Sequence, residues 1–120
     1  MPLKKVLAEL MDNVPGALGA ILADWEGEMV DQVARMDDYE LKVIGATKGI
    51  LLTRVQDALK RLRTSSLQEM VITTDQVQTL IAPITSEYFL VLILRRDEQV
   101  LGRAMFQVKR CVGALKKEIE

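Results

Sequence analysis

Residues 88–94 read YFLVLIL, an uninterrupted run of apolar side chains. Successive side chains of a β-strand point to opposite faces of its sheet, so such a run predicts a strand that is buried on both faces. Residues 17–23, ALGAILA, are also small and apolar throughout. We therefore expect these two strands at the centre of a sheet, with helices covering both of its faces.

Three further runs predict the rest of the sheet, at residues 28–34, 67–74 and 77–84, with a turn at Asp75-Gln76 and another at Thr85-Ser86. The runs 28–34 and 67–74 carry polar residues on both faces, which is typical of edge strands. The prediction is a five-stranded antiparallel sheet. Numbered along the chain, its strands lie in the order 2-1-5-4-3.

Periodic apolar residues predict three helices around this sheet. The first spans residues 2–13 and ends before Val14-Pro15-Gly16. The second begins with a cap at Asp37 or Asp38 and continues to Leu62, and the third follows a cap at Asp97. The apolar stripe of the third helix comprises Leu101, Met105, Val108, Val112, Leu115 and Ile119. The order αββαβββα predicts one α/β (α+β) domain over residues 1–120.

Composition excludes several classes of function. Lys and Arg number 16 and Asp and Glu 17, so the chain lacks the basic footprint of a nucleic-acid-binding domain. It has no histidine and one cysteine, which removes histidine-dependent nucleophilic catalysis and cysteine-based metal cages. We expect no catalytic, cofactor-binding or metal-ligating residues, and hence no enzyme.

No stretch has the character of a signal peptide or is long enough to span a bilayer. These features predict a cytoplasmic protein.

The segment 43–52, VIGATKGILL, resembles a phosphate-binding loop at first sight. Such a loop needs its lysine directly after the last glycine and a position between a strand and a helix. Here Lys48 precedes Gly49, and the segment lies within a helical pattern. Gly45 and Gly49 are four residues apart, so they share one helix face and permit close approach of another backbone.

The predicted central helix carries two apolar stripes. We call the first stripe, which runs from Leu41 to Leu62, the central-helix seam. The second stripe is rotated by roughly a quarter to a third of a turn. One stripe must pack on the sheet, and the other suggests contact with a twin subunit. A single wide core face is the alternative interpretation. The seam comprises Leu41, Gly45, Lys48, Leu52, Val55, Leu59 and Leu62, and the second stripe comprises Val43, Ile44, Thr47, Ile50, Leu51 and Ala58.

One side of the last predicted helix is basic. It could meet an acidic lipid or an acidic partner, although a solvated face also explains it, because the overall charge is balanced. Its residues are Arg103, Lys109, Arg110, Lys116 and Lys117.

Two long segments carry a family resemblance. The segment VPGALGAILADWEGEMV resembles the start of Roadblock (dynein light chain type) domains, with a glycine near the first strand and an acidic-glycine turn before the second. The segment VITTDQVQTLIAPITSEYFLVLILRRDEQVLGRAMFQVKRCVGAL resembles their latter half. The resemblance covers essentially the whole chain, including the order αββαβββα.

The resemblance implies a non-enzymatic homodimer in which central helices meet and the following strands pair edge to edge. In bacteria such dimers often serve Ras-like small GTPases and can stimulate GTP hydrolysis. A purely structural dimerisation or adaptor module in a larger motor or signalling complex is the alternative. The expected dimer interface comprises Leu41, Gly45, Lys48, Gly49, Leu52, Val55, Leu59, Met70, Val71 and Ile72, and the expected partner-binding residues are Glu40, Lys42, Lys48, Gln56 and Lys60.

Overall fold

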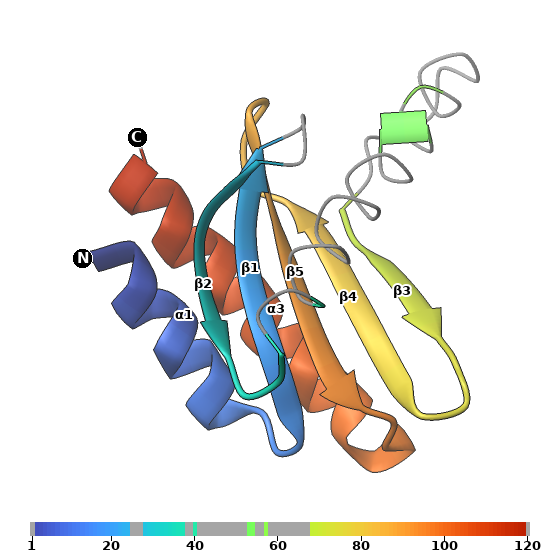
Figure 1. Ribbon diagram of the computed structural model, residues 1–120. Helices are drawn as coiled ribbons and strands as arrows, with labels where there is room; N and C mark the ends of the chain where they lie inside the picture. Colours follow the sequence, from blue (N-terminus) through green and yellow to red (C-terminus); the bar gives the residue numbers. More distant parts are fainter. Residues whose placement is uncertain are drawn as a thin grey trace.

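A computed structural model describes residues 2–24, 28–37, 40, 53–54, 57 and 68–119. Its elements along the chain are helix α1 (Pro2–Asn13), strands β1 (Ala17–Asp24), β2 (Met29–Ala34), β3 (Met70–Thr73), β4 (Val77–Pro83) and β5 (Tyr88–Arg95), and helix α3 (Glu98–Ile119). Figure 1 shows the strands in one sheet, with α1 and α3 side by side across one of its faces.

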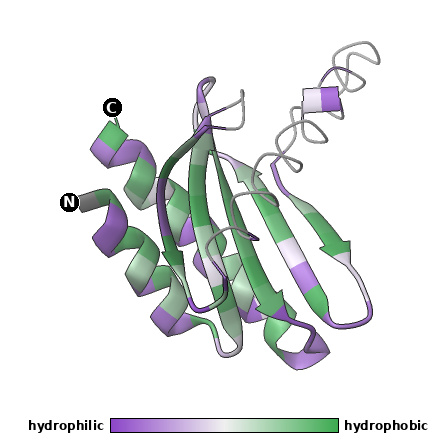
Figure 2. Ribbon diagram, in the orientation of Figure 1, coloured by the Kyte–Doolittle hydropathy of each residue, from purple (hydrophilic) through white to green (hydrophobic). Residues whose placement is uncertain are grey.

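The five-stranded sheet has the order β2-β1-β5-β4-β3, and the described neighbours pair antiparallel. This confirms the predicted topology. The run that predicted a doubly buried strand is β5, in which residues 89–94 are at most 1% exposed. Strand β1 lies beside it, and the edges are β2 and β3, as predicted. The polar residues of the run 67–74 fall largely outside β3, whose own residues MVIT are mostly hydrophobic (Figure 2).

The sheet carries a hydrophobic cluster on each face. On the face toward α1 and α3, Leu90, Leu92 and Leu94 pack with the two helices. On the opposite face, Phe89, Val91 and Ile93 form the centre of a second buried cluster. Alternate residues of one strand therefore serve two cores, which is what the all-apolar sequence of β5 requires.

The turn from α1 into β1 depends on Gly16. Its φ is +80°, a left-handed conformation that favours glycine. Its carbonyl accepts a hydrogen bond of 3.0 Å from the Arg95 N–H, which joins the turn to the end of β5. Gly16 thus aligns the start of β1 with its central neighbour.

Two predicted caps are confirmed. The Glu40 N–H donates to Asp37 Oδ2 at 3.1 Å, and Glu40 is helical, so Asp37 caps the start of that helix. The Gln99 N–H donates to Asp97 Oδ1 at 2.9 Å at the start of α3. Of the predicted central helix, residues 40, 53, 54 and 57 are described and helical, and the remainder lies outside the described residues.

The start of the third strand differs from the sequence prediction. The third strand begins at Met70 rather than at residue 67, because its pairing with β4 starts at Met70 opposite Ile81. It is therefore a short edge strand of four residues. Gln68 and Glu69 precede it as irregular chain.

The buried side of α3 is also rotated from the predicted stripe. Its fully buried line is Ala104, Val108, Cys111 and Leu115, while Leu101, Met105, Val112 and Ile119 are only partly buried beside it. Helix α1 packs along α3 and covers the side that carries Cys111, so the centre of burial moves toward α1.

Candidate protein-interaction surfaces

Strand β3 forms one edge of the sheet. Its residues pair with β4 in the register Met70↔Ile81, Val71↔Leu80, Ile72↔Thr79 and Thr73↔Gln78. Within the described residues β3 has no second strand neighbour. An edge strand presents backbone N–H and C=O groups on its outer side, which can pair with another strand.

The side chains of β3 are apolar and only half-buried. Met70 and Ile72 pack with the cluster around Phe89, whereas Val71 packs on the face that carries α1 and α3. These three residues were predicted to lie in a dimer interface, and the structure brings them together at an accessible sheet edge. The arrangement suits strand pairing with a further apolar contact on each face.

Gln78 fixes the geometry of this edge. It is 1% exposed, and its side chain bridges two elements at 3.5 Å each: Nε2 donates to Thr73 Oγ1, and Oε1 accepts from the Asp97 N–H. A buried amide is costly unless its polar atoms are paired. Gln78 therefore ties the end of β3 to the cap of α3.

The other predicted site residues fall on the central helix. Glu40 is exposed at the helix start. The remaining ones lie outside the described residues: Leu41, Lys42, Gly45, Lys48, Gly49, Leu52, Val55, Gln56, Leu59 and Lys60.

The outer surface of α3 holds a residue that the sequence prediction missed. Phe106 is 59% exposed, and among the described residues only Val30 is another exposed large hydrophobic side chain. The predicted basic residues lie on the same helix, and all five are exposed. Phe106 lay outside the predicted apolar stripe. A large apolar residue outside the stripe was the one sign in the sequence that Phe106 could be exposed. Only the observed packing shows which side of α3 faces solvent.

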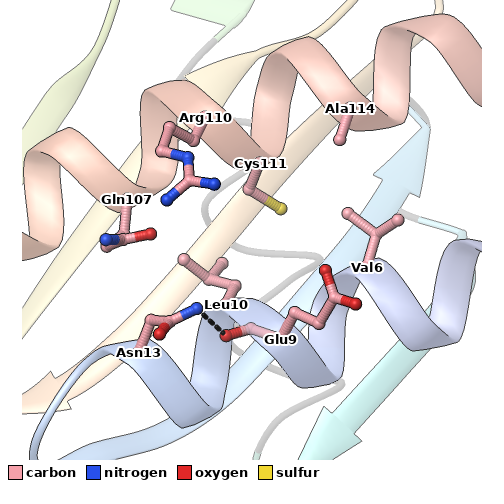
Figure 3. Close-up of a pocket in the computed structure, with 8 residues that line it drawn as sticks. All are labelled: Val6, Glu9, Leu10, Asn13, Gln107, Arg110, Cys111 and Ala114. Carbon is pink, nitrogen blue, oxygen red and sulfur yellow. Dashed lines mark hydrogen bonds between the residues drawn. The ribbon is translucent and has the colours of Figure 1, made fainter.

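A small hollow of about 80 Å³ lies between the packed helices α1 and α3. Val6, Glu9, Leu10 and Asn13 line it from α1, and Gln107, Arg110, Cys111 and Ala114 line it from α3 (Figure 3). Burial, and secondarily the Glu9 carboxylate, raise the pKa of the Cys111 thiol to about 12. The thiol is therefore neutral at physiological pH, which makes it a poor nucleophile and metal ligand.

Metal sites and membrane-spanning helices are both absent from the described residues. Within residues 2–24, 28–37 and 68–119 and the few described positions between them, no group of His, Cys, Asp and Glu could hold a metal ion. Over the same part of the chain, no helix combines the length and hydrophobicity needed to cross a membrane.

Comparison with known structures shows close similarity of fold. A Roadblock/LC7 domain from Streptomyces avermitilis superposes with a TM-score of 0.85 at 18% identity, covering 99% of this chain and 98% of that one. MglB from Myxococcus xanthus gives 0.86 at 14% identity, covering 98% and 94%. The gliding protein MglB from Thermus thermophilus gives 0.84 at 22% identity, covering 97% and 87%.

Sequence comparison identifies the family. No curated protein sequence matches significantly. The sequence model of the Roadblock/LC7 domain, however, matches residues 3–94, which span α1 and most of the sheet through Leu94 of β5. The chain therefore belongs to the Roadblock/LC7 domain family.

Proposed function

We propose that this protein is a cytoplasmic, non-enzymatic homodimeric regulator or scaffold that binds a Ras-like small GTPase. Its membership of the Roadblock/LC7 domain family supports the proposal, because the resemblance seen in the sequence implies dimers of a kind that often serve such GTPases in bacteria. Within this chain, the main support for a dimer is strand β3. It is a sheet edge with the half-buried apolar residues Met70, Val71 and Ile72.

Pairing of β3 with its symmetry mate would continue the sheet across two subunits. A two-fold antiparallel pair is self-complementary, since each strand offers the same edge to the other. Strand β3 has only four residues, so it supplies few ladder hydrogen bonds, each worth about 1 kcal/mol net. A stable interface buries about 1,200–2,000 Å² in total. The pairing therefore needs a second contact, for which the central-helix seam is the candidate.

The GTPase would bind where the two central helices meet. Polar residues beside an apolar centre suit a transient interface, in which charges mainly set the association rate and its salt dependence. Glu40, Lys42, Lys48, Gln56 and Lys60 are the candidates. Any stimulation of hydrolysis would come from holding the GTPase's own switch residues in position, since positioning dominates catalysis of phosphoryl transfer.

The test is the affinity for the cognate GTPase loaded with a GTP analogue or with GDP. We expect tighter binding of the GTP-analogue form, weakened by Lys42→Glu combined with Lys60→Glu, which both lie outside the expected dimer interface, while the dimer is retained. The same charge reversal at exposed Arg95, at the end of β5, is the control and should leave binding unchanged. Equal binding of both nucleotide forms, or of neither, would contradict the regulator and leave a structural dimerisation module.

A further inference from the structure

The outer surface of α3 combines basic side chains with an exposed aromatic ring. Between Gln99 and Lys117 the helix carries five basic residues and no acidic one, whereas the whole chain has a net charge of −1. At 3.6 residues per turn, Phe106 points to the side opposite the buried line of Ala104, Val108, Cys111 and Leu115. An exposed aromatic ring is thus surrounded by positive charge.

Two glycines lie on the same side of α3. Gly102, Phe106, Lys109 and Gly113 are spaced four, three and four residues apart, within a sector of about 60°; we call them the outer line of α3. A Cβ built on Gly102 or Gly113 would meet nothing within 4 Å. Glycine in a helix interior is less favourable than alanine. Within the described fold, neither glycine therefore has a steric reason to be glycine.

We propose that the outer line of α3 is a docking surface for an acidic amphipathic helix of a partner protein. Phe106 would provide the apolar anchor, and the two glycines would let the partner backbone approach closely on either side of it. The basic side chains would pair with acidic residues flanking the partner's apolar stripe. Arg103, Arg110 and Lys117 lie on one flank of the line, and Lys116 lies on the other.

A second copy of this chain does not fit the surface. Two-fold antiparallel packing of α3 about Phe106 would bring Arg103 opposite Lys109 of the other copy. Contacts between like charges oppose association. This surface is therefore distinct from the β3 edge proposed for the dimer.

A membrane surface fits less well than a helix. An interfacial membrane helix buries a broad face of bulky apolar side chains. The exposed side of α3 offers only Phe106, with glycines beside it. Small residues flanking one aromatic anchor suit the ridge of another helix, since ridges of one helix pack into the grooves of its partner.

The test uses the full chain, labelled with ¹⁵N, and a stapled helical peptide of about 20 residues, which spans about 30 Å. The peptide carries a leucine and alanine stripe at 4-3-4 spacing with glutamates on both flanks. A second peptide replaces each glutamate with lysine, and vesicles of equimolar phosphatidylserine and phosphatidylcholine form a third arm. Chemical-shift changes locate binding, and their titration gives the Kd.

We expect the acidic peptide to shift amides of residues 99–117 and the lysine peptide to bind nowhere on α3. Phe106→Ala, or Arg103→Glu with Arg110→Glu, should weaken binding by about tenfold or more, the loss typical of an interface hot spot. Arg95→Glu is a control charge reversal outside α3 and should leave the Kd unchanged.

The glycines separate docking from folding. Gly102→Ala and Gly113→Ala should raise the Tm, because alanine favours the helix and has open space here, yet weaken peptide binding by about tenfold when combined. The proposal is overturned if the acidic peptide does not bind, if it shifts residues elsewhere, or if the lysine peptide binds α3 equally well. Binding of the vesicles in place of the peptide would overturn it in favour of a lipid surface.

Discussion

At the scale of single residues, Cys111 packs between α1 and α3 at 5% exposure. In the sequence Cys111 lies beside the apolar stripe of the last helix, which predicts a buried small side chain, and the structure confirms this burial. The sequence could not indicate the contribution of Glu9 to its raised pKa, because that acid lies about a hundred residues earlier in the chain. Contact across two helices determines the chemistry of the thiol.

The raised pKa of Cys111 predicts a loss of stability in alkali. The thiol has an ordinary pKa of 9.0 and a folded-state pKa of about 12. Between these pH values the unfolded chain releases the proton and the folded chain retains it. The free energy of unfolding should therefore fall above pH 9 by up to about 1.4 kcal/mol per pH unit from this group.

Denaturant unfolding of the native chain and of Cys111→Ala between pH 8 and pH 11 measures this effect. The variant is less stable at pH 8 because it leaves a cavity. It should nevertheless have the shallower decline with pH. Parallel declines would mean that the thiol titrates normally in the folded state.

Asp97 offers a second prediction at this scale. Its side chain accepts the Gln99 N–H at the start of α3, so Asp97→Ala should cost about 1 kcal/mol of stability. Asp75→Ala changes an exposed acid in the β3–β4 turn and should fall within about 0.5 kcal/mol of the native chain. Thermal unfolding of both variants makes the comparison, and equal losses would exclude a capping role for Asp97.

At the scale of elements, alternation and periodicity predicted most of the fold. The all-apolar strand, the positions of the edge strands and the two caps followed from side-chain direction and from backbone groups that need partners. The start of β3 did not follow, because residues 68–69 are compatible with a strand and only the pairing with β4 determines where the strand begins. The buried line of α3 depends in the same way on where α1 packs.

The candidate surfaces were less predictable than the fold. Met70, Val71 and Ile72 could be chosen because the polar residues on either side of them in the run 67–74 indicated an edge strand. Phe106 could not, because one apolar residue outside a helical stripe has no meaning until the orientation of the helix is known. Surface function depends on how elements face solvent, which local sequence specifies weakly.

The edge role of β3 predicts the effect of proline there. Val71→Pro removes a backbone donor from the strand and should shift the protein toward monomers. Val30→Pro is the matched control on the opposite edge strand. Val30 is exposed and lies between Met29 and Asp31, where the pairing with β1 shifts register, so it has no paired residue there. The Val30→Pro variant should therefore retain the dimer.

Size-exclusion chromatography with light scattering distinguishes the two variants, and circular dichroism checks that both remain folded. Loss of the dimer in both would indicate a general effect of proline on the sheet. Retention of the dimer in both would exclude β3 from the interface.

At the scale of the whole molecule, the sheet buries an apolar cluster on each face and presents separate surfaces to its surroundings. The β3 edge lies at the end of the strand order, and the outer line of α3 lies on the helix layer. A dimer built through β3 would leave both copies of α3 accessible to other proteins. This arrangement suits a scaffold that joins one partner to another.

Both candidate functions require two copies of the chain, so the mass in solution is the direct test of the proposed dimer. Sedimentation equilibrium at micromolar concentration measures it without a partner protein. We expect a species of twice 13.5 kDa that dissociates on dilution or with Val71→Pro. A single species of 13.5 kDa at every concentration would contradict it.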